Sequence, residues 1–143
     1  MNAPISWQAT AVAIQGRAVL IEGPAGVGKS SLALALIDRG AQLIGDDGVE
    51  LVRSGAQLVA RPHPNTRGLI EVRNLGLLTM PVAGDTPVAL VLLLDQKAPR
   101  YIEQAEVTER GGVTLPLIRL WPDGHALPLR AELALQRYGR GGG

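Results

Sequence analysis

The sequence contains no cysteine and no phenylalanine, and its only aromatic side chains besides histidine are two tryptophans and two tyrosines. The absence of cysteine excludes a disulfide framework and a thiolate metal site. With so few aromatic rings, the hydrophobic core must be built from aliphatic side chains. The length of 143 residues fits one ordinary domain, and the 46% hydrophobic content is typical of a folded protein.

The chain also lacks a dominant charge and a long apolar run. Its formal net charge is +1, which creates no field that would attract nucleic acid or an anionic membrane, so we expect neither as a partner. No stretch approaches the ~20 apolar residues of a membrane span. The N-terminus does not show a charged region followed by a long apolar one, as a signal peptide would. We therefore expect a soluble, cytoplasmic protein.

The hydrophobic pattern predicts an α/β fold with a P-loop NTPase-like mixed β-sheet flanked by helices in a single domain. This domain is expected to cover residues 1–140, with a disordered tail at 141–143. Pro116 interrupts the expected strand 113–120 and predicts a sheet edge or a bulge there. The expected strands are 9–14, 18–22, 41–44, 69–73, 88–94 and 113–120, with a hairpin of 49–53 and 57–60, and the expected helices are 30–39 and 129–138.

Residues 23–30 read GPAGVGKS and match the Walker A pattern G-x-x-x-x-G-K-[ST]. Lysine is scarce in this chain, since Lys29 and Lys97 are the only lysines among 14 basic residues. Glycines let backbone N–H groups turn toward phosphate oxygens, and the helix N-terminus that follows adds partial positive charge. The predicted nucleotide-binding residues are Gly23, Pro24, Ala25, Gly26, Val27, Gly28, Lys29, Ser30 and Ser31.

Phosphoryl transfer also needs a carboxylate near the metal and the nucleophile, and the sequence offers two candidates. Asp95 ends the apolar run 88–94 and resembles a generic Walker B aspartate. The adjacent pair Asp46 and Asp47, together with Glu71, is the other candidate. The residue pattern favours the adjacent pair without excluding a plain solvated turn.

Several other polar and aromatic residues have a simple structural interpretation. His63 and His125 lie in loops and have no partner at metal-ligand spacing. Trp7 and Trp121 are expected to anchor the core or an interface. Arg61, Arg67 and Arg73 surround the loop before Glu71, where they either form a solvated face or grip a phosphate or an acidic partner.

Three motifs at preserved spacing resemble the catalytic domain of HPr kinase/phosphorylase, in the compact form that lacks the N-terminal domain of the family. They are the P-loop with Lys29 and Ser30, the segment 43–49 (LIGDDGV), and the segment 69–76 (LIEVRNLG). The resemblance covers roughly residues 5–95 and fades afterwards. The P-loop alone is unspecific, whereas the three motifs together are much more specific.

The resemblance implies Mg²⁺-dependent transfer of phosphate from ATP to a serine of HPr, a small phosphocarrier protein. It also implies the reverse reaction, in which inorganic phosphate attacks phosphoserine and releases pyrophosphate. By position, Lys29 would bind phosphate, Ser30 and Glu71 would hold Mg²⁺, Asp47 would accept or donate the proton, and Asp46 would support it. A stretch of about residues 70–79 would serve both directions, and the family is often hexameric.

The chain departs from the family at several positions. Gln8 stands where the family usually carries a histidine, and glutamine cannot titrate near neutral pH. Asn74 replaces a preferred glycine, although asparagine tolerates a left-handed backbone better than most residues. The C-terminal part lacks the family's clear P-G-R-N segment, for which Arg119 is only a weak substitute.

Two rival functions therefore stay open. A small-molecule P-loop kinase would use the same phosphate loop and give Asp95 the metal role. A nucleotide-sensing regulator would bind ATP without transferring phosphate, and Gln8 and the eroded C-terminal segment are the features that favour it.

Overall fold

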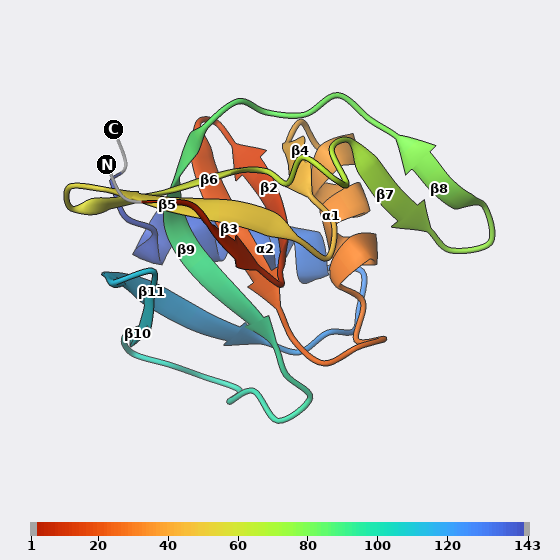
Figure 1. Cartoon of the computed structure of the whole chain (residues 1–143). Coiled ribbons are helices and arrows are strands. Elements are labelled where there is room, and N and C mark those ends of the chain that lie inside the picture. Colours follow the sequence, from red (N-terminus) through yellow and green to blue (C-terminus); the bar gives the residue numbers. More distant parts are fainter. Residues whose placement is uncertain (1–2, 142–143) are drawn as a thin grey trace.

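The computed structural model describes residues 3–141 and shows a mixed β-sheet with two helices on one face (Figure 1). Over these residues the main sheet has nine strands, and a separate two-stranded sheet projects from it. In chain order the elements are β1 (Ile5–Trp7), β2 (Thr10–Ile14), β3 (Arg17–Glu22), α1 (Lys29–Asp38), β4 (Gln42–Gly45), β5 (Val49–Ser54), β6 (Gln57–Pro62), β7 (Leu69–Val72), β8 (Gly76–Thr79), β9 (Thr86–Leu94), β10 (Glu106–Arg110), β11 (Val113–Leu120) and α2 (Leu127–Tyr138).

Strands β3, β9 and β11 form the parallel centre of the sheet. Strand β9 pairs in parallel with β3 on one side and with β11 on the other. On the far side of β3 the sheet continues through antiparallel pairing with β2 and then β4. The three parallel strands end at the same edge, so the loops that follow them lie at that edge. This edge carries the candidate site.

The core lies on both faces of the sheet and is aliphatic, as the composition predicts. Along β3, Val19 and Ile21 face α1 and α2, while Ala18 and Leu20 pack on the opposite face against β5 and β6. This alternation follows from the two-residue period of a strand. The helices supply Leu32, Leu36, Ala131 and Leu135 to the first cluster.

The expected elements are present, with shifted ends. Helix α2 begins at Leu127 rather than residue 129, because Pro128 is accommodated in the first turn, where its missing N–H costs nothing. Strand β11 is not an edge strand, because it lies between β9 and β10. Pro116 pairs with Val107 of β10 and lies one residue before the pairing with β9 begins at Leu117. The predicted edge is therefore present only locally, at Pro116, and the pairing with β10 shows no bulge there.

The sequence did not reveal three short strands, β1, β8 and β10. Each is mostly exposed, so none carries the apolar alternation that marks a strand. Residues 142–143 of the expected tail lie outside the described residues. Within the described part of the chain, no helix is both long and apolar enough to cross a membrane.

A charged cluster fastens β1 and β10 to the start of the phosphate loop. Arg110 donates to both carboxylate oxygens of Glu22, at 3.0 and 2.7 Å, and lies 5.3 Å from the ring centroid of Trp7. The Trp7 indole N–H donates to the same carboxylate at 2.9 Å. The side chains of Arg110 and Glu22 are only 16% and 14% exposed, and the ion pair raises the pKa of Arg110.

Replacing Arg110 with alanine should lower the free energy of unfolding by about 2 kcal/mol, because Glu22 is left largely buried without its cation. Urea unfolding measures the loss. The matched control is Arg39→Ala, whose ion pair with Glu132 is more exposed, at 43% for the Arg39 side chain. A loss for Arg110→Ala no larger than that of the control would contradict the prediction.

Candidate functional site

The phosphate loop joins β3 to α1 in a conformation that requires glycine. Gly23 has φ 150° and Gly28 has φ 112°, both in the range that side chains with a Cβ rarely adopt. A Cβ at Gly23 would also lie 3.0 Å from the carbonyl oxygen of Leu94 and 3.0 Å from Cγ1 of Val27. The loop is therefore packed closely against the end of β9.

The N-terminus of α1 has backbone donors that the helix itself does not use. Its first intrahelical bond runs from the N–H of Leu32 to the Gly28 carbonyl, at 3.0 Å. Among the described residues, α1 has no side-chain N-cap bond and no acidic residue in its first turn. The N–H groups of residues 29–31 are thus directed away from the helix, and they form the kind of site that binds an anion.

Lys29 lies across its own loop. Its ammonium group donates to the carbonyl of Gly23 at 2.7 Å and to that of Pro24 at 3.3 Å. The ammonium group therefore lies within the loop, and because lysine has three donors on a flexible stem, it can exchange these carbonyls for phosphate oxygens.

Asp46 is held by hydrogen bonds from three different elements. Its Oδ1 accepts from the hydroxyl of Ser30 at 2.6 Å and from that of Thr10 at 3.1 Å. Its Oδ2 accepts from the backbone N–H of Glu71 at 2.9 Å. One carboxylate therefore joins α1, β2 and β7 directly beside the phosphate loop.

Asp47 takes a different direction from Asp46 because β4 has ended at Gly45. Its backbone is left-handed, with φ 62°, and its N–H donates to the Thr10 hydroxyl at 3.3 Å. Aspartate tolerates this conformation better than most residues. The turn lets both neighbouring carboxylates contribute to one region, whereas in a strand they would point to opposite faces.

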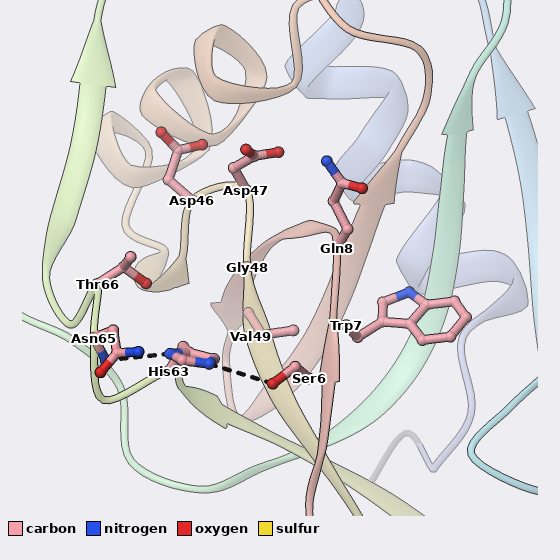
Figure 2. Close-up of a pocket in the computed structure, with 10 residues that line it drawn as sticks. All are labelled: Ser6, Trp7, Gln8, Asp46, Asp47, Gly48, Val49, His63, Asn65 and Thr66. Carbon is pink, nitrogen blue, oxygen red and sulfur yellow. Dashed lines mark hydrogen bonds between the residues drawn. The ribbon is translucent and has the colours of Figure 1, made fainter.

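Two cavities meet at this acid pair, and both are lined by Asp46 and Asp47. The smaller, of about 250 Å³, also contains Gly26, Lys29, Ser30, Ser31, Glu71 and Arg73. Figure 2 shows the larger, of about 510 Å³, which the acid pair lines at one end together with Gln8, His63, Asn65 and Thr66. The phosphate loop thus faces one side of the pair and a second open space faces the other.

The oxygen atoms of the smaller cavity suit Mg²⁺, which prefers hard oxygen ligands. The Ser30 hydroxyl lies beside the Asp46 carboxylate, and Glu71 lines the same space. Across the described residues, no three His, Cys, Asp or Glu side chains are grouped as a metal site by themselves. Any Mg²⁺ there would depend on Ser30, one or two carboxylates and substrate phosphates, as is usual for this ion.

Asp95 is placed differently. It accepts from the N–H of Lys97 at 2.8 Å and from the Arg119 guanidinium at 3.0 Å, and these two contacts lower the pKa of its carboxyl. Arg119 also binds Glu106 at 2.7 Å. Among the described residues that line the two cavities, Asp95 does not appear. The generic Walker B position is thus occupied by a structural ion pair.

The structure adds Thr10 to the site, which the sequence did not single out. It is a fully buried hydroxyl in an otherwise apolar strand, and that isolation within an apolar segment is the signal that could have identified it. Of the three arginines before and after Glu71, Arg73 lines the smaller cavity, while Arg61 pairs with Glu50 at 3.0 Å.

These features define a class of protein, a mixed α/β domain in which a glycine-rich loop of Walker A sequence lies beside two adjacent aspartates. The family model described as the HPr serine kinase C-terminal domain matches residues 1–88, and the chain belongs to this family. The chain is 36% identical over 129 residues to the HPr kinase/phosphorylase of Leptothrix cholodnii, covering 89% of this chain and 39% of that protein.

A second curated relative and a solved structure are also HPr kinases. The chain is 42% identical over 96 residues to the HPr kinase/phosphorylase of Neisseria meningitidis, covering 62% of this chain and 30% of that protein. It thus spans about a third of the length of these curated relatives. The solved structure of the Hpr(Ser) kinase/phosphatase from Coxiella burnetii matches 92% of this chain and 88% of that one, with a TM-score of 0.83 and 30% identity.

The lowered pKa of Asp95 predicts a pH-dependent contribution to stability. Stability from this group should be fully present above the unfolded-state pKa of about 3.9 and lost as the pH falls through the lower folded-state value. Asp95→Asn should therefore be less stable than the wild type at pH 7, with the difference shrinking below pH 4.

Urea unfolding from pH 2.5 to 7 tests this. The matched control, Glu103→Gln, removes the same charge from an exposed residue and should give a small difference across the range. A difference for Asp95→Asn that does not change with pH would show that the ion pair with Arg119 contributes nothing to folding.

Proposed function

We propose that this protein transfers the terminal phosphate of ATP, with Mg²⁺, to a serine hydroxyl of an HPr-like phosphocarrier protein. One observation carries the proposal: the 2.6 Å bond between Ser30 and Asp46 joins the phosphate loop to the acid pair where two cavities meet. Family membership supplies the HPr-like partner as the acceptor to test.

The smaller cavity is the proposed position of the phosphates. The free N–H groups at the start of α1 would bind phosphate oxygens, and Lys29 would leave the Gly23 and Pro24 carbonyls to contact the outer phosphates. Ser30 and Glu71 would hold Mg²⁺, which would supply charge neutralisation to the phosphates during transfer. Asp46 would hold the Ser30 hydroxyl in place.

Asp47 is the proposed proton acceptor. It lines both cavities, so it can lie between the terminal phosphate and an acceptor serine that enters from the larger cavity (Figure 2). The serine oxygen would form the new P–O bond while the bond from the γ-phosphorus to ADP breaks. The hydroxyl proton would pass to the Asp47 carboxylate.

The reverse reaction would use the same groups. Phosphate bound at the phosphate loop would attack phosphoserine and form pyrophosphate. Protonated Asp47 would then return its proton to the serine oxygen. Gln8 lines the larger cavity, where the resemblance implies a histidine. Its amide can donate and accept hydrogen bonds but cannot move a proton near neutral pH.

Gln8 also favours the second candidate function, a regulator that senses nucleotide without transfer. The small-molecule kinase has less support, because Asp95 is engaged with Arg119 and Lys97 rather than with the phosphate cavity. A hexameric assembly, implied by family resemblance, stays a prediction. Since the proposed reaction consumes ATP, we expect it in the cytoplasm.

The proposal is tested by incubating the protein with Mg-ATP and the HPr-like protein of the same organism, and measuring seryl phosphate by mass spectrometry. The wild type should form it, and Asp47→Asn should be at least about 100-fold slower, because a general base is lost. Affinity for ATP should change little, and Asp95→Asn should keep its transfer rate. ATP binding without seryl phosphate in the wild type would select the sensing regulator instead.

A second prediction concerns Thr10, whose hydroxyl binds both aspartates. Thr10→Val keeps the shape of the side chain but removes the contacts to the Asp46 carboxylate and the Asp47 N–H. The maximal transfer rate should fall about tenfold or more, because small displacements of reacting groups are costly, with a smaller change in KM for the acceptor. Thr10→Ser should retain most of the rate. Equal rates for both variants would remove Thr10 from the site.

A further inference from the structure

A third cavity, of about 200 Å³, lies between the segment that follows β9 and the end of β11. Its lining includes Tyr101, Ile102 and Trp121. Two of the four tyrosine and tryptophan side chains of the whole sequence therefore meet at this one cavity. They are well exposed, Tyr101 at 78% and Trp121 at 46%. Exposed aromatic rings beside a cavity favour a ligand with a flat ring.

The arginines of this cavity are largely engaged within the fold. Arg119 binds Asp95 and Glu106. Arg130 donates to the backbone carbonyls of Trp121 at 3.3 Å and Asp123 at 2.8 Å. The remaining one, Arg100, is exposed. With two of three guanidinium groups already engaged, the wall offers aromatic faces more than free positive charge, which suits an uncharged ring better than a second phosphate.

The cavity lies at the same edge of the sheet as the phosphate loop. The loop follows β3, the cavity follows β9 and β11, and these three strands are parallel neighbours (Figure 1). Gly23 is packed against the Leu94 carbonyl, and the N–H of Asp95 donates to the Leu120 carbonyl at 2.9 Å. The three segments are therefore consecutive along one edge.

The direction of a bound triphosphate follows from this order. The acid pair follows β4, which lies beyond β2 on the other side of β3. A triphosphate whose terminal phosphate faces Asp46 and Asp47 has its other end directed away from them, toward β9 and β11. The nucleoside would then approach the cavity that contains Tyr101 and Trp121.

We propose that Tyr101 and Trp121 form the nucleoside subsite, in which the base of the nucleotide stacks on exposed aromatic rings. This rests on the proposed function, because it takes the phosphate loop to hold a nucleoside triphosphate. Trp121 is fixed in advance, since its indole N–H donates to the Ala98 carbonyl at 2.6 Å. A ring held in this way loses little conformational freedom when a base stacks on it.

The test compares the affinity for Mg-ATP with that for Mg-tripolyphosphate, which has the phosphates but no nucleoside, by isothermal titration calorimetry. Wild type should bind ATP more tightly. Tyr101→Ala should weaken ATP binding about tenfold, since stacking a base on an aromatic ring is worth roughly that much. Tripolyphosphate affinity should not change, and Tyr101→Phe should retain the wild-type affinity for ATP.

The matched control is Val107→Ala, which removes an apolar side chain that is 75% exposed on β10. It should leave both affinities unchanged. Unchanged ATP affinity in Tyr101→Ala would overturn the proposed nucleoside subsite but would leave the proposal for the phosphate loop intact. This conclusion would also hold if sedimentation showed that the variant disrupts an assembly of copies. If wild type binds neither ligand, the phosphate-binding proposal fails, and the subsite fails with it.

Discussion

The carboxylate of Asp46 is the contact on which the candidate site depends. It accepts hydrogen bonds from Ser30 on α1, Thr10 on β2 and the backbone of Glu71 on β7. These elements are distant in sequence, so a single charged group fixes the mutual position of the phosphate loop, the turn that carries Asp47 and the hairpin that carries Glu71. Hydrogen bonds to a charged acceptor are stronger than neutral ones, which suits this role.

The adjacent residues Asp46 and Asp47 make different contacts in the site. Asp46 is surrounded by donors and holds other groups in place, whereas Asp47 makes its contact to Thr10 through the backbone N–H. The left-handed turn at Asp47 separates the two side chains. A carboxylate that is not used for support is the better candidate to exchange a proton with a substrate.

Much of the architecture could be predicted from the sequence because its elements are buried. The apolar runs that became β3 and β9, and the P-loop before α1, carry clear periodicity and a complete motif. Strands β1, β8 and β10 were not predicted because they are exposed and short. The choice between Asp95 and the acid pair depended on the partner of each carboxylate, and a contact such as that of Asp95 with Arg119 cannot be read from spacing.

The roles of Thr10 and Trp121 depend on tertiary contacts for the same reason. In the sequence Thr10 is a single hydroxyl in an apolar strand, and only the fold shows that this hydroxyl lies between two aspartates. Trp121 was expected to anchor the core or an interface, but the residue is 46% exposed at the same cavity as Tyr101, and its indole N–H is held by the Ala98 carbonyl. Neither the partners of a buried hydroxyl nor the meeting of two distant rings at one cavity follows from the sequence pattern alone.

The hydrogen bonds of Lys29 to Gly23 and Pro24 have a consequence for how the loop receives an anion. The ammonium group neutralises the partial negative charge of those carbonyls, so the glycine-rich segment keeps its shape before any ligand arrives. Binding then becomes an exchange of acceptors around one cation, and its enthalpy reflects the difference between carbonyl and phosphate oxygens. The loop should therefore select highly charged anions over neutral ligands, since only a strong acceptor can displace the carbonyls of the chain itself.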